Sequence, residues 1–295
     1  VRVHQHLLDR GDLSLDDRHR AQHALALDYL KAGLLDRAED ALLKLEGSRF
    51  EAQSRLALLA NYERSRDWQN AAVIAQKLET SGQGSFKGRL SHYLCEQAAD
   101  CVAAKDLAQA QTLLAQAMTI APGAARPRMD LARLQHQQGE RVQAFDTLVQ
   151  AVAAAPSAVA LMAPLMASYA VNAGQCPVAL EQLKSIYAED RSLDVLDAIV
   201  ALEAATGDTT STARDWYAHH LEKEPSLVAA AKWIAGEKLE HEQFHPQVQR
   251  ALDHAVKPLT RYRCAACGFE AKQHFWQCPG CQAWDSYPAR RVEEL

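Results

Sequence analysis

Four cysteines near the C-terminal end of the chain carry the clearest chemical signal in the sequence. They form two Cys-x-x-Cys pairs, Cys264 with Cys267 and Cys278 with Cys281. Each short loop can direct two thiolates at one ion, so the two loops together suit the tetrahedral S₄ coordination of zinc or iron. The four cysteines are therefore the predicted ligands of one Zn or Fe ion per chain.

Other uses of the four thiols fit the sequence less well. Two disulfides would suit a secreted protein, which the rest of the chain does not resemble, and a thioredoxin-like dithiol needs a βαβ pattern that is absent. A catalytic zinc keeps one position open for water, whereas four cysteines close the coordination shell, which favours a structural site. Six aromatic residues are expected to form a shell around the metal: Tyr262, Phe269, Phe275, Trp276, Trp284 and Tyr287.

The sequence offers no recognisable catalytic motif. None of the 12 histidines stands in a known pattern with a nucleophile, and His241 and His245 have i, i+4 spacing without a further ligand. Gly82-Gln83-Gly84 lacks the lysine of a phosphate-binding loop. We therefore expect no enzymatic activity.

Composition points to packed helices in a reducing compartment. The chain of 295 residues is rich in alanine and only 6% aromatic. Its net charge of -5 argues against nucleic-acid binding. The sequence contains no run of 18 apolar residues, so it predicts no transmembrane helix. Cys95, Cys101 and Cys176 are expected to be free thiols.

A pattern that repeats about every 34 residues precedes the cysteine pairs. Ala110 and Pro122 recur 34 residues later as Ala144 and Pro156. This is typical of tetratricopeptide repeats (TPR), in which small residues let two antiparallel helices pack closely and neighbouring units stack into a superhelix. The predicted units span about 19–51, 52–85, 91–124, 125–158, 160–193 and 194–227.

The sequence thus predicts an all-α fold, a TPR superhelical solenoid with a small C-terminal rubredoxin-like (zinc-ribbon) metal module. The predicted repeat domain spans 1–257, with flanking helices that include 226–242 and 246–257, and the metal-binding domain spans 258–295. Pro164 should delay or kink the first helix of the fifth unit. Only Lys257-Pro258 and a few more residues precede Cys264, so the metal module should pack against the solenoid.

The concave face of such a solenoid, lined by the first helix of each unit, commonly takes a segment of another protein. Any single polar residue there is more often simply solvated, but as a set these residues form the candidate partner-binding face. The set is Glu63, Arg64, His92, Glu96, Arg126, Met129, Arg133, His136 and Gln137.

Two segments resemble the lipopolysaccharide assembly protein B family (LapB, also called YciM). They are the early repeat Asp28–Asp40 and the tail from Tyr262 to Trp284, with its two cysteine pairs. The resemblance maps the family's metal ligands onto the four cysteines. It implies an N-terminal transmembrane helix, missing from a chain that begins at Val1 and looks like a fragment, and a TPR domain on the cytoplasmic face of the inner membrane.

Further expectations follow from the same resemblance. It implies a non-enzymatic adaptor that brings the membrane protease FtsH to the lipid A deacetylase LpxC, promotes LpxC degradation and so restrains lipopolysaccharide synthesis. Further candidate partners are other lipopolysaccharide assembly proteins and a second copy of the chain. Gln282 stands where a classical rubredoxin has glycine, which should weaken one N–H···S turn and argues against electron transfer.

Two other interpretations remain open. The first is a rubredoxin-type redox protein with iron in the Cys₄ site. The second is a TPR and zinc-ribbon scaffold for other protein or nucleic-acid partners. Basic residues near the cysteines would serve the nucleic acid: Arg261, Arg263, Lys272, Arg290 and Arg291.

Overall fold

The computed structural model describes residues 1–207, 212–237 and 245–295 of the chain. His241, and with it the predicted His241–His245 pair, lies outside the described residues. The chain divides into two compact units, Val1–Pro127 and Arg128–Leu295.

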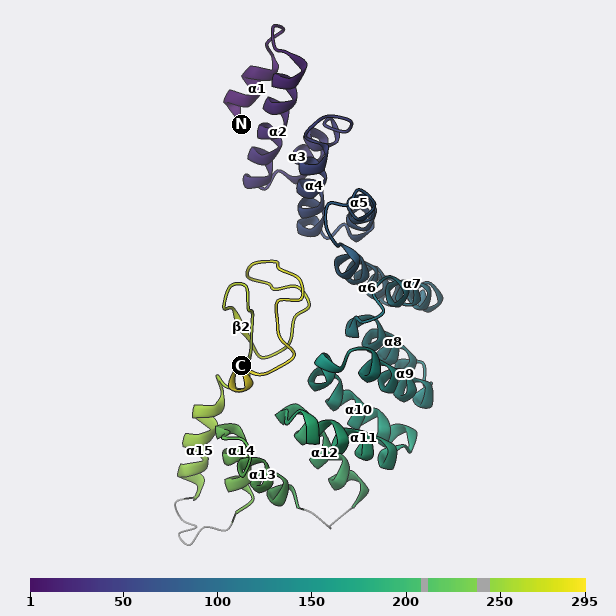
Figure 1. The fold of residues 1–295 in the computed structure, drawn as a ribbon, viewed down its shortest axis with the longest axis vertical. Coiled ribbons are helices and arrows are strands. Elements are labelled where there is room, and N and C mark those ends of the chain that lie inside the picture. Colours follow the sequence, from purple (N-terminus) through teal and green to yellow (C-terminus); the bar gives the residue numbers. More distant parts are fainter. Residues whose placement is uncertain (208–211, 238–244) are drawn as a thin grey trace. The chain divides into compact units, whose positions relative to one another are not determined.

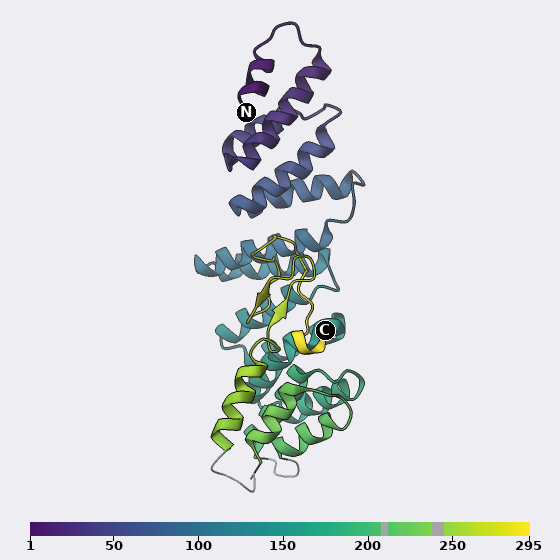
Figure 2. The same cartoon turned by 90° about the vertical axis from the view of Figure 1, so that its left-hand side faces the viewer.

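The first unit consists of helices that run back and forth in successive pairs (Figures 1 and 2). They are α1 (Arg2–Leu8), α2 (Leu15–Lys31), α3 (Leu35–Leu43), α4 (Glu51–Ser65), α5 (Trp68–Thr80), α6 (Lys87–Ala103), α7 (Leu107–Ile120) and the start of α8 (Ala125–Gln137). The pairs α2–α3, α4–α5 and α6–α7 correspond to the first three predicted repeats, but each first helix begins one to four residues before the predicted start. Ala38, Ala71 and Ala110, one from each second helix, are completely buried, which allows the close helix packing that the repeat pattern predicts.

The second unit continues the same pattern and ends in the metal module. After the rest of α8 come α9 (Arg141–Ala154), η1 (Pro156–Ala158), α10 (Val159–Ala173), α11 (Cys176–Glu189), α12 (Leu193–Thr206), α13 (Ala213–Leu221), α14 (Leu227–Ala235), α15 (His245–Val256), β1 (Tyr262–Arg263), β2 (Glu270–Ala271) and η3 (Val292–Glu294). The pairs α8–α9, α10–α11 and α12–α13 correspond to the last three predicted repeats, with α10 and α12 each beginning one residue before the predicted start. The all-α solenoid with a C-terminal ribbon is therefore confirmed as the fold class.

The turn inside each repeat requires a left-handed backbone. Gly33, Gly174 and Gly207 end first helices with φ of 72°, 69° and 71°. Arg66 and Lys105 take the same role in the second and third repeats, with φ of 58° and 65°. A side chain at positive φ costs about 1 kcal/mol, so these two repeats tolerate a strain that glycine avoids elsewhere.

Two local predictions differ from the structure. Pro164 was expected to delay its helix or to kink it, and the delay is wrong, because α10 begins at Val159, five residues earlier. The proline removes one backbone hydrogen bond, and the packing of α10 against α9, α11 and α12 outweighs that loss. The helix predicted over 226–242 ends as α14 at Ala235, where Gly236 forms its C-cap, and positions 238–242 of that prediction lie outside the described residues.

None of the described helices is by itself both long and apolar enough to cross a bilayer. Arg141–Ala154 and Pro156–Ala173 meet that criterion only when taken together, across a bend of 115°.

Candidate metal centre

Two equivalent turns hold the four cysteines. In the first turn the Gly268 N–H donates to the Cys264 carbonyl at 2.8 Å, and the Cys264 N–H donates to the Phe269 carbonyl at 2.9 Å. The second turn repeats both bonds fourteen residues later, from Gln282 to Cys278 at 2.8 Å and from Cys278 to Ala283 at 2.9 Å. The pairing of β1 with β2, with Tyr262 opposite Ala271, ties the first turn into a hairpin.

Gln282 keeps the turn that its residue type was expected to weaken. Its φ of 62° is left-handed, close to the 77° of Gly268 at the equivalent position. The two turns therefore have the same backbone hydrogen bonds, and the cost of the glutamine is conformational strain in the second.

The four sulfurs lie where one tetrahedral ion would need them. All four Sγ atoms are within 4.8 Å of one another. Cys264 and Cys281 are 3.9 Å apart, and Cys267 and Cys278 are 3.7 Å apart. Zn–S bonds of about 2.3 Å in a tetrahedron place sulfurs about 3.8 Å apart, so these two separations match such an ion.

The two members of each pair differ in exposure. Cys264 and Cys278 are 1% exposed, whereas Cys267 and Cys281 lie at the surface. Burial alone would raise the pKa of Cys264, but Ser286 Oγ at 3.2 Å and the amides of Cys267 and Ala266 outweigh it and lower that pKa to about 6. This favours the thiolate of Cys264, which is the form that binds a metal. Without a metal, the Phe269 amide lowers the pKa of Cys267, but burial and hydrogen bonds with the other three cysteines outweigh it and raise that pKa to about 12.

The predicted aromatic shell covers one side of the sulfur cluster. Tyr262 and Tyr287 are buried with Cys264 and Cys278, and Phe275 packs against them. Leu161 of α10 packs on the same cluster, so the ribbon shares its core with the solenoid helix. Phe269 instead is 44% exposed.

His274 also lies among these rings, a position that no motif in the sequence predicted. Its ring stands edge-on to Tyr262, Trp276 and Tyr287, with centroids 4.7–6.0 Å away. Its Nε2 is 3.1 Å from the Tyr287 carbonyl. His274 therefore belongs to the packing of the ribbon.

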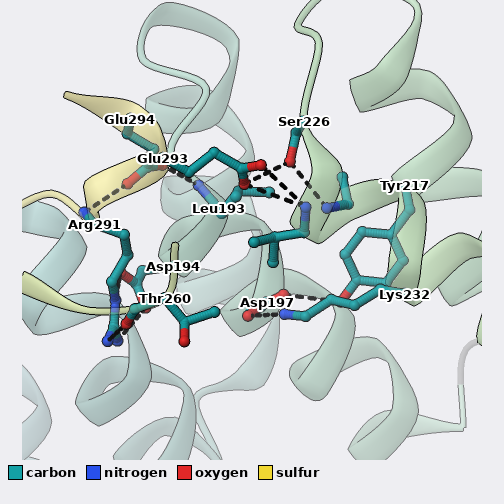
Figure 3. Close-up of polar contacts among 12 residues, drawn as sticks. Leu193, Asp194, Asp197, Tyr217, Ser226, Lys232, Thr260, Arg291, Glu293 and Glu294 are labelled. Carbon is teal, nitrogen blue, oxygen red and sulfur yellow. Dashed lines mark hydrogen bonds and ion pairs between the residues drawn. The ribbon is translucent and has the colours of Figure 1, made fainter. Parts of the chain in front are cut away.

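A C-terminal tail, defined here as residues 290–295, fastens the ribbon to the solenoid (Figure 3). Glu294 accepts a hydrogen bond from the Leu193 N–H at the start of α12, at 2.7 Å. Glu293 accepts from Ser226 Oγ at 2.9 Å and from the Leu227 and Val228 N–H groups at 2.6 and 3.1 Å at the start of α14. The two glutamates thus satisfy exposed amides at two helix N-termini, where negative charge is favoured.

The arginines of the tail form ion pairs with the same helices and loops. Arg291 binds Asp194 through two bonds, at 2.8 and 2.9 Å, and its guanidinium lies 4.2 Å from the centre of the Tyr262 ring. Arg290 binds Asp190 at 2.9 Å. Arg290 and Arg291, two of the residues suggested for nucleic acid, therefore bind the solenoid instead. The ribbon packs on the solenoid within the second unit, as expected.

The nine candidate partner-binding residues fall into two groups by exposure. His92, Arg126 and Met129 are buried, at 4%, 8% and 3% exposure. The guanidinium of Arg126 binds Glu96 at 2.6 Å and lies 3.4 Å from His92 Nδ1, across the contact between adjacent repeats. These three residues offer little surface to a partner.

The remaining candidates keep some exposure. Arg64, Arg133, His136 and Gln137 are partly or fully exposed, as is Glu96, whereas Glu63 is held by the Tyr93 hydroxyl. His136 stacks on Tyr169, with ring centroids 4.2 Å apart. A role for them in partner binding stays a prediction.

Fold and site together define a class, the TPR proteins that carry a rubredoxin-type metal module. Residues 102–169 match the family described as tetratricopeptide repeat, and residues 262–287 match one described as rubredoxin metal binding domain. The solved structure of pilF from Pseudomonas aeruginosa is 18% identical, covers 75% of this chain and 99% of its own, and has a TM-score of 0.37.

The particular resemblance is to lipopolysaccharide assembly protein B. The protein of that name from Escherichia coli K12 is 26% identical over 100% of this chain and 77% of its own length. The one from Haemophilus influenzae Rd is 23% identical over 97% of this chain and 73% of its own. The resemblance that two motifs indicated thus extends along the whole chain.

Proposed function

We propose that this chain is a non-enzymatic adaptor that regulates lipopolysaccharide synthesis by holding protein partners. The observation that carries the proposal is the similarity to lipopolysaccharide assembly protein B over the full chain, which includes both the repeats and the ribbon. Stacked helical repeats present an extended surface suited to a partner segment.

The finer form of the proposal names the partners. The adaptor recruits or modulates the membrane protease FtsH, so that the deacetylase LpxC is degraded, and it contacts further lipopolysaccharide assembly proteins. The complete protein is held at the inner membrane by an N-terminal helix, with the repeats on the cytoplasmic face. We place the repeat domain at 1–257 and the metal-binding domain at 258–295.

In this proposal the metal has a structural role. Cys264, Cys267, Cys278 and Cys281 bind one zinc ion, which would hold the two turns together. The folded ribbon then presents its tail to α12 and α14, through Glu294 and Glu293. Because so small a segment depends on its metal for folding, losing the ion would release this contact as well.

The test is recruitment of partners by the full-length protein in membranes. FtsH and LpxC should co-purify with the wild type and be lost, together with bound zinc, from Cys278→Ser. Cys176→Ser is the matched control, because Cys176 lies in α11 outside the sulfur cluster, and it should retain both metal and partners. Full recruitment by a folded but metal-free Cys278→Ser protein would contradict the proposal.

The exposure of Cys267 and Cys281 favours a second candidate, a rubredoxin-type redox protein, because an electron donor or acceptor could approach that side of the ion. With iron bound, the protein would show visible charge-transfer bands that bleach on reduction. A colourless protein with one zinc per chain, prepared from cells supplied with both metals, would dismiss this candidate.

A further inference from the structure

A cavity of about 520 Å³ lies where the tail crosses the solenoid, entirely within the second unit. Leu193, Val228 and Leu259 provide apolar walls, and charged side chains of α12, α14 and the ribbon complete the lining. A volume of roughly 300–1,000 Å³ is typical of sites for small molecules.

The acidic groups of the cavity are already engaged. Asp194 is held by two bonds from Arg291. Asp197 accepts from the Tyr217 hydroxyl at 2.8 Å and pairs with Lys232 (Figure 3).

Glu293, the third acid of the lining, is turned toward the N-terminus of α14. Little acidic capacity is therefore left inside the cavity for a further cation.

The basic groups at the rim have fewer ion-pair partners than the acidic groups. Lys257 and Lys272 are exposed, and neither side chain forms an ion pair with any described residue. Arg261 lies 3.6 Å from Glu270, which is bound more closely by Arg263 at 2.8 Å. The cavity therefore has two unmatched cations and a third that is only weakly paired.

These three cations come from different segments and line the same opening. Lys257 follows α15, Arg261 precedes β1 and Lys272 follows β2. Phosphate is the anion that such a group binds best, because its oxygens accept charge-assisted bonds from several directions at once. We propose that this cavity binds a phosphate monoester, held by Lys257, Arg261 and Lys272 with its organic part against the apolar wall.

Binding there would also act on the ribbon. Lys257 belongs to the solenoid and Lys272 to the ribbon, so a bound phosphate bridges the two and stabilises the docked arrangement over the released one. The site is complete only while the ribbon is folded and docked.

Glycerol 3-phosphate is a suitable probe, with glycerol at equal concentration and chloride at equal ionic strength as controls. Calorimetry on the zinc-loaded protein should show saturable binding to one site. Lys257→Gln/Lys272→Gln should weaken it at least about tenfold, the loss expected for removing charged hydrogen-bond donors. Arg141→Gln/Lys223→Gln, which removes two exposed charges elsewhere in the second unit, should bind as the wild type does.

A second arm identifies the source of the phosphate. The same three proteins, the wild type and the two double variants with their zinc content checked, are sedimented with phosphatidylcholine vesicles with and without phosphatidic acid. Binding of the soluble ester alone indicates a metabolite, and phosphatidic-acid-dependent sedimentation that Lys257→Gln/Lys272→Gln abolishes indicates a lipid headgroup. Absence of both, or equal binding by the lysine variant and its control, overturns the proposal.

Discussion

Replacing Arg291 should release the ribbon from the solenoid while leaving its metal ligands intact. Arg291 makes two bonds to Asp194, one to the Thr260 carbonyl at 2.9 Å and a cation–π contact with Tyr262. Arg291→Ala removes all of these and leaves Asp194, whose side chain is only 11% exposed, without its countercharge.

The size of the effect follows from this burial. Breaking a buried ion pair by removing one partner costs about 3–5 kcal/mol. Arg291 itself is 25% exposed, so water can partly replace it, and we expect about 2–3 kcal/mol. Arg291→Lys keeps the charge but loses the two-pronged geometry and the stacking, so it should cost about 1 kcal/mol.

Hydrogen exchange of the Leu193 amide reports the docking directly, because that N–H donates to Glu294. In Arg291→Ala its exchange should accelerate about 30- to 150-fold, the factor that corresponds to 2–3 kcal/mol. Zinc content should stay at one ion per chain. Arg133→Ala, which breaks the more exposed pair with Asp130 in α8, is the control and should leave Leu193 unchanged. Unaltered exchange in a zinc-loaded Arg291→Ala protein would refute the docking role of the tail.

Three further predictions concern the ribbon and the last repeat. Gln282→Gly should relieve left-handed strain and strengthen zinc retention against a chelator by about 1 kcal/mol, whereas Gly268→Ala should weaken it by about as much. Burial lowers the pKa of His220, so in mild acid the unfolded state binds a proton at this histidine more readily than the folded state does. Thermal stability should therefore fall as pH drops below about 6.5, and His220→Asn should flatten that dependence. Removing zinc with a chelator should abolish protection of the Leu193 amide, and retained protection would show that docking does not need the metal.

The repeats and the cysteine cluster could be predicted because their determinants are local. Fully buried Ala38, Ala71 and Ala110 recur at the spacing that close helix packing requires. The two Cys-x-x-Cys turns need only a few consecutive residues each, and their sulfurs meet because ten residues allow a hairpin between them. Local spacing alone is thus enough to indicate both features.

The contacts between distant segments could not be predicted in the same way. Arg126 was expected on an open face, but it spans the contact with the preceding repeat to reach Glu96 and His92. A residue on a first helix faces either the groove or the neighbouring repeat, depending on how far each helix pair is rotated relative to the next. The spacing of residues in the sequence does not define this rotation. Arg290 and Arg291 lie about a hundred residues from their partners Asp190 and Asp194, so no local pattern links them.

The tail also explains why a small metal module can matter to a long solenoid. Its backbone is tied to the start of the ribbon, since the Val292 N–H donates to the Arg261 carbonyl at 2.8 Å. Its side chains satisfy amides at the N-termini of α12 and α14, groups that an α-helix cannot satisfy by itself. The ribbon thus caps α12, the first helix of the sixth repeat, and α14, the helix that follows that repeat. If a metal binds the cysteines as proposed, the stability that it gives the ribbon would be passed to α12 and α14, which contain none of the four cysteines.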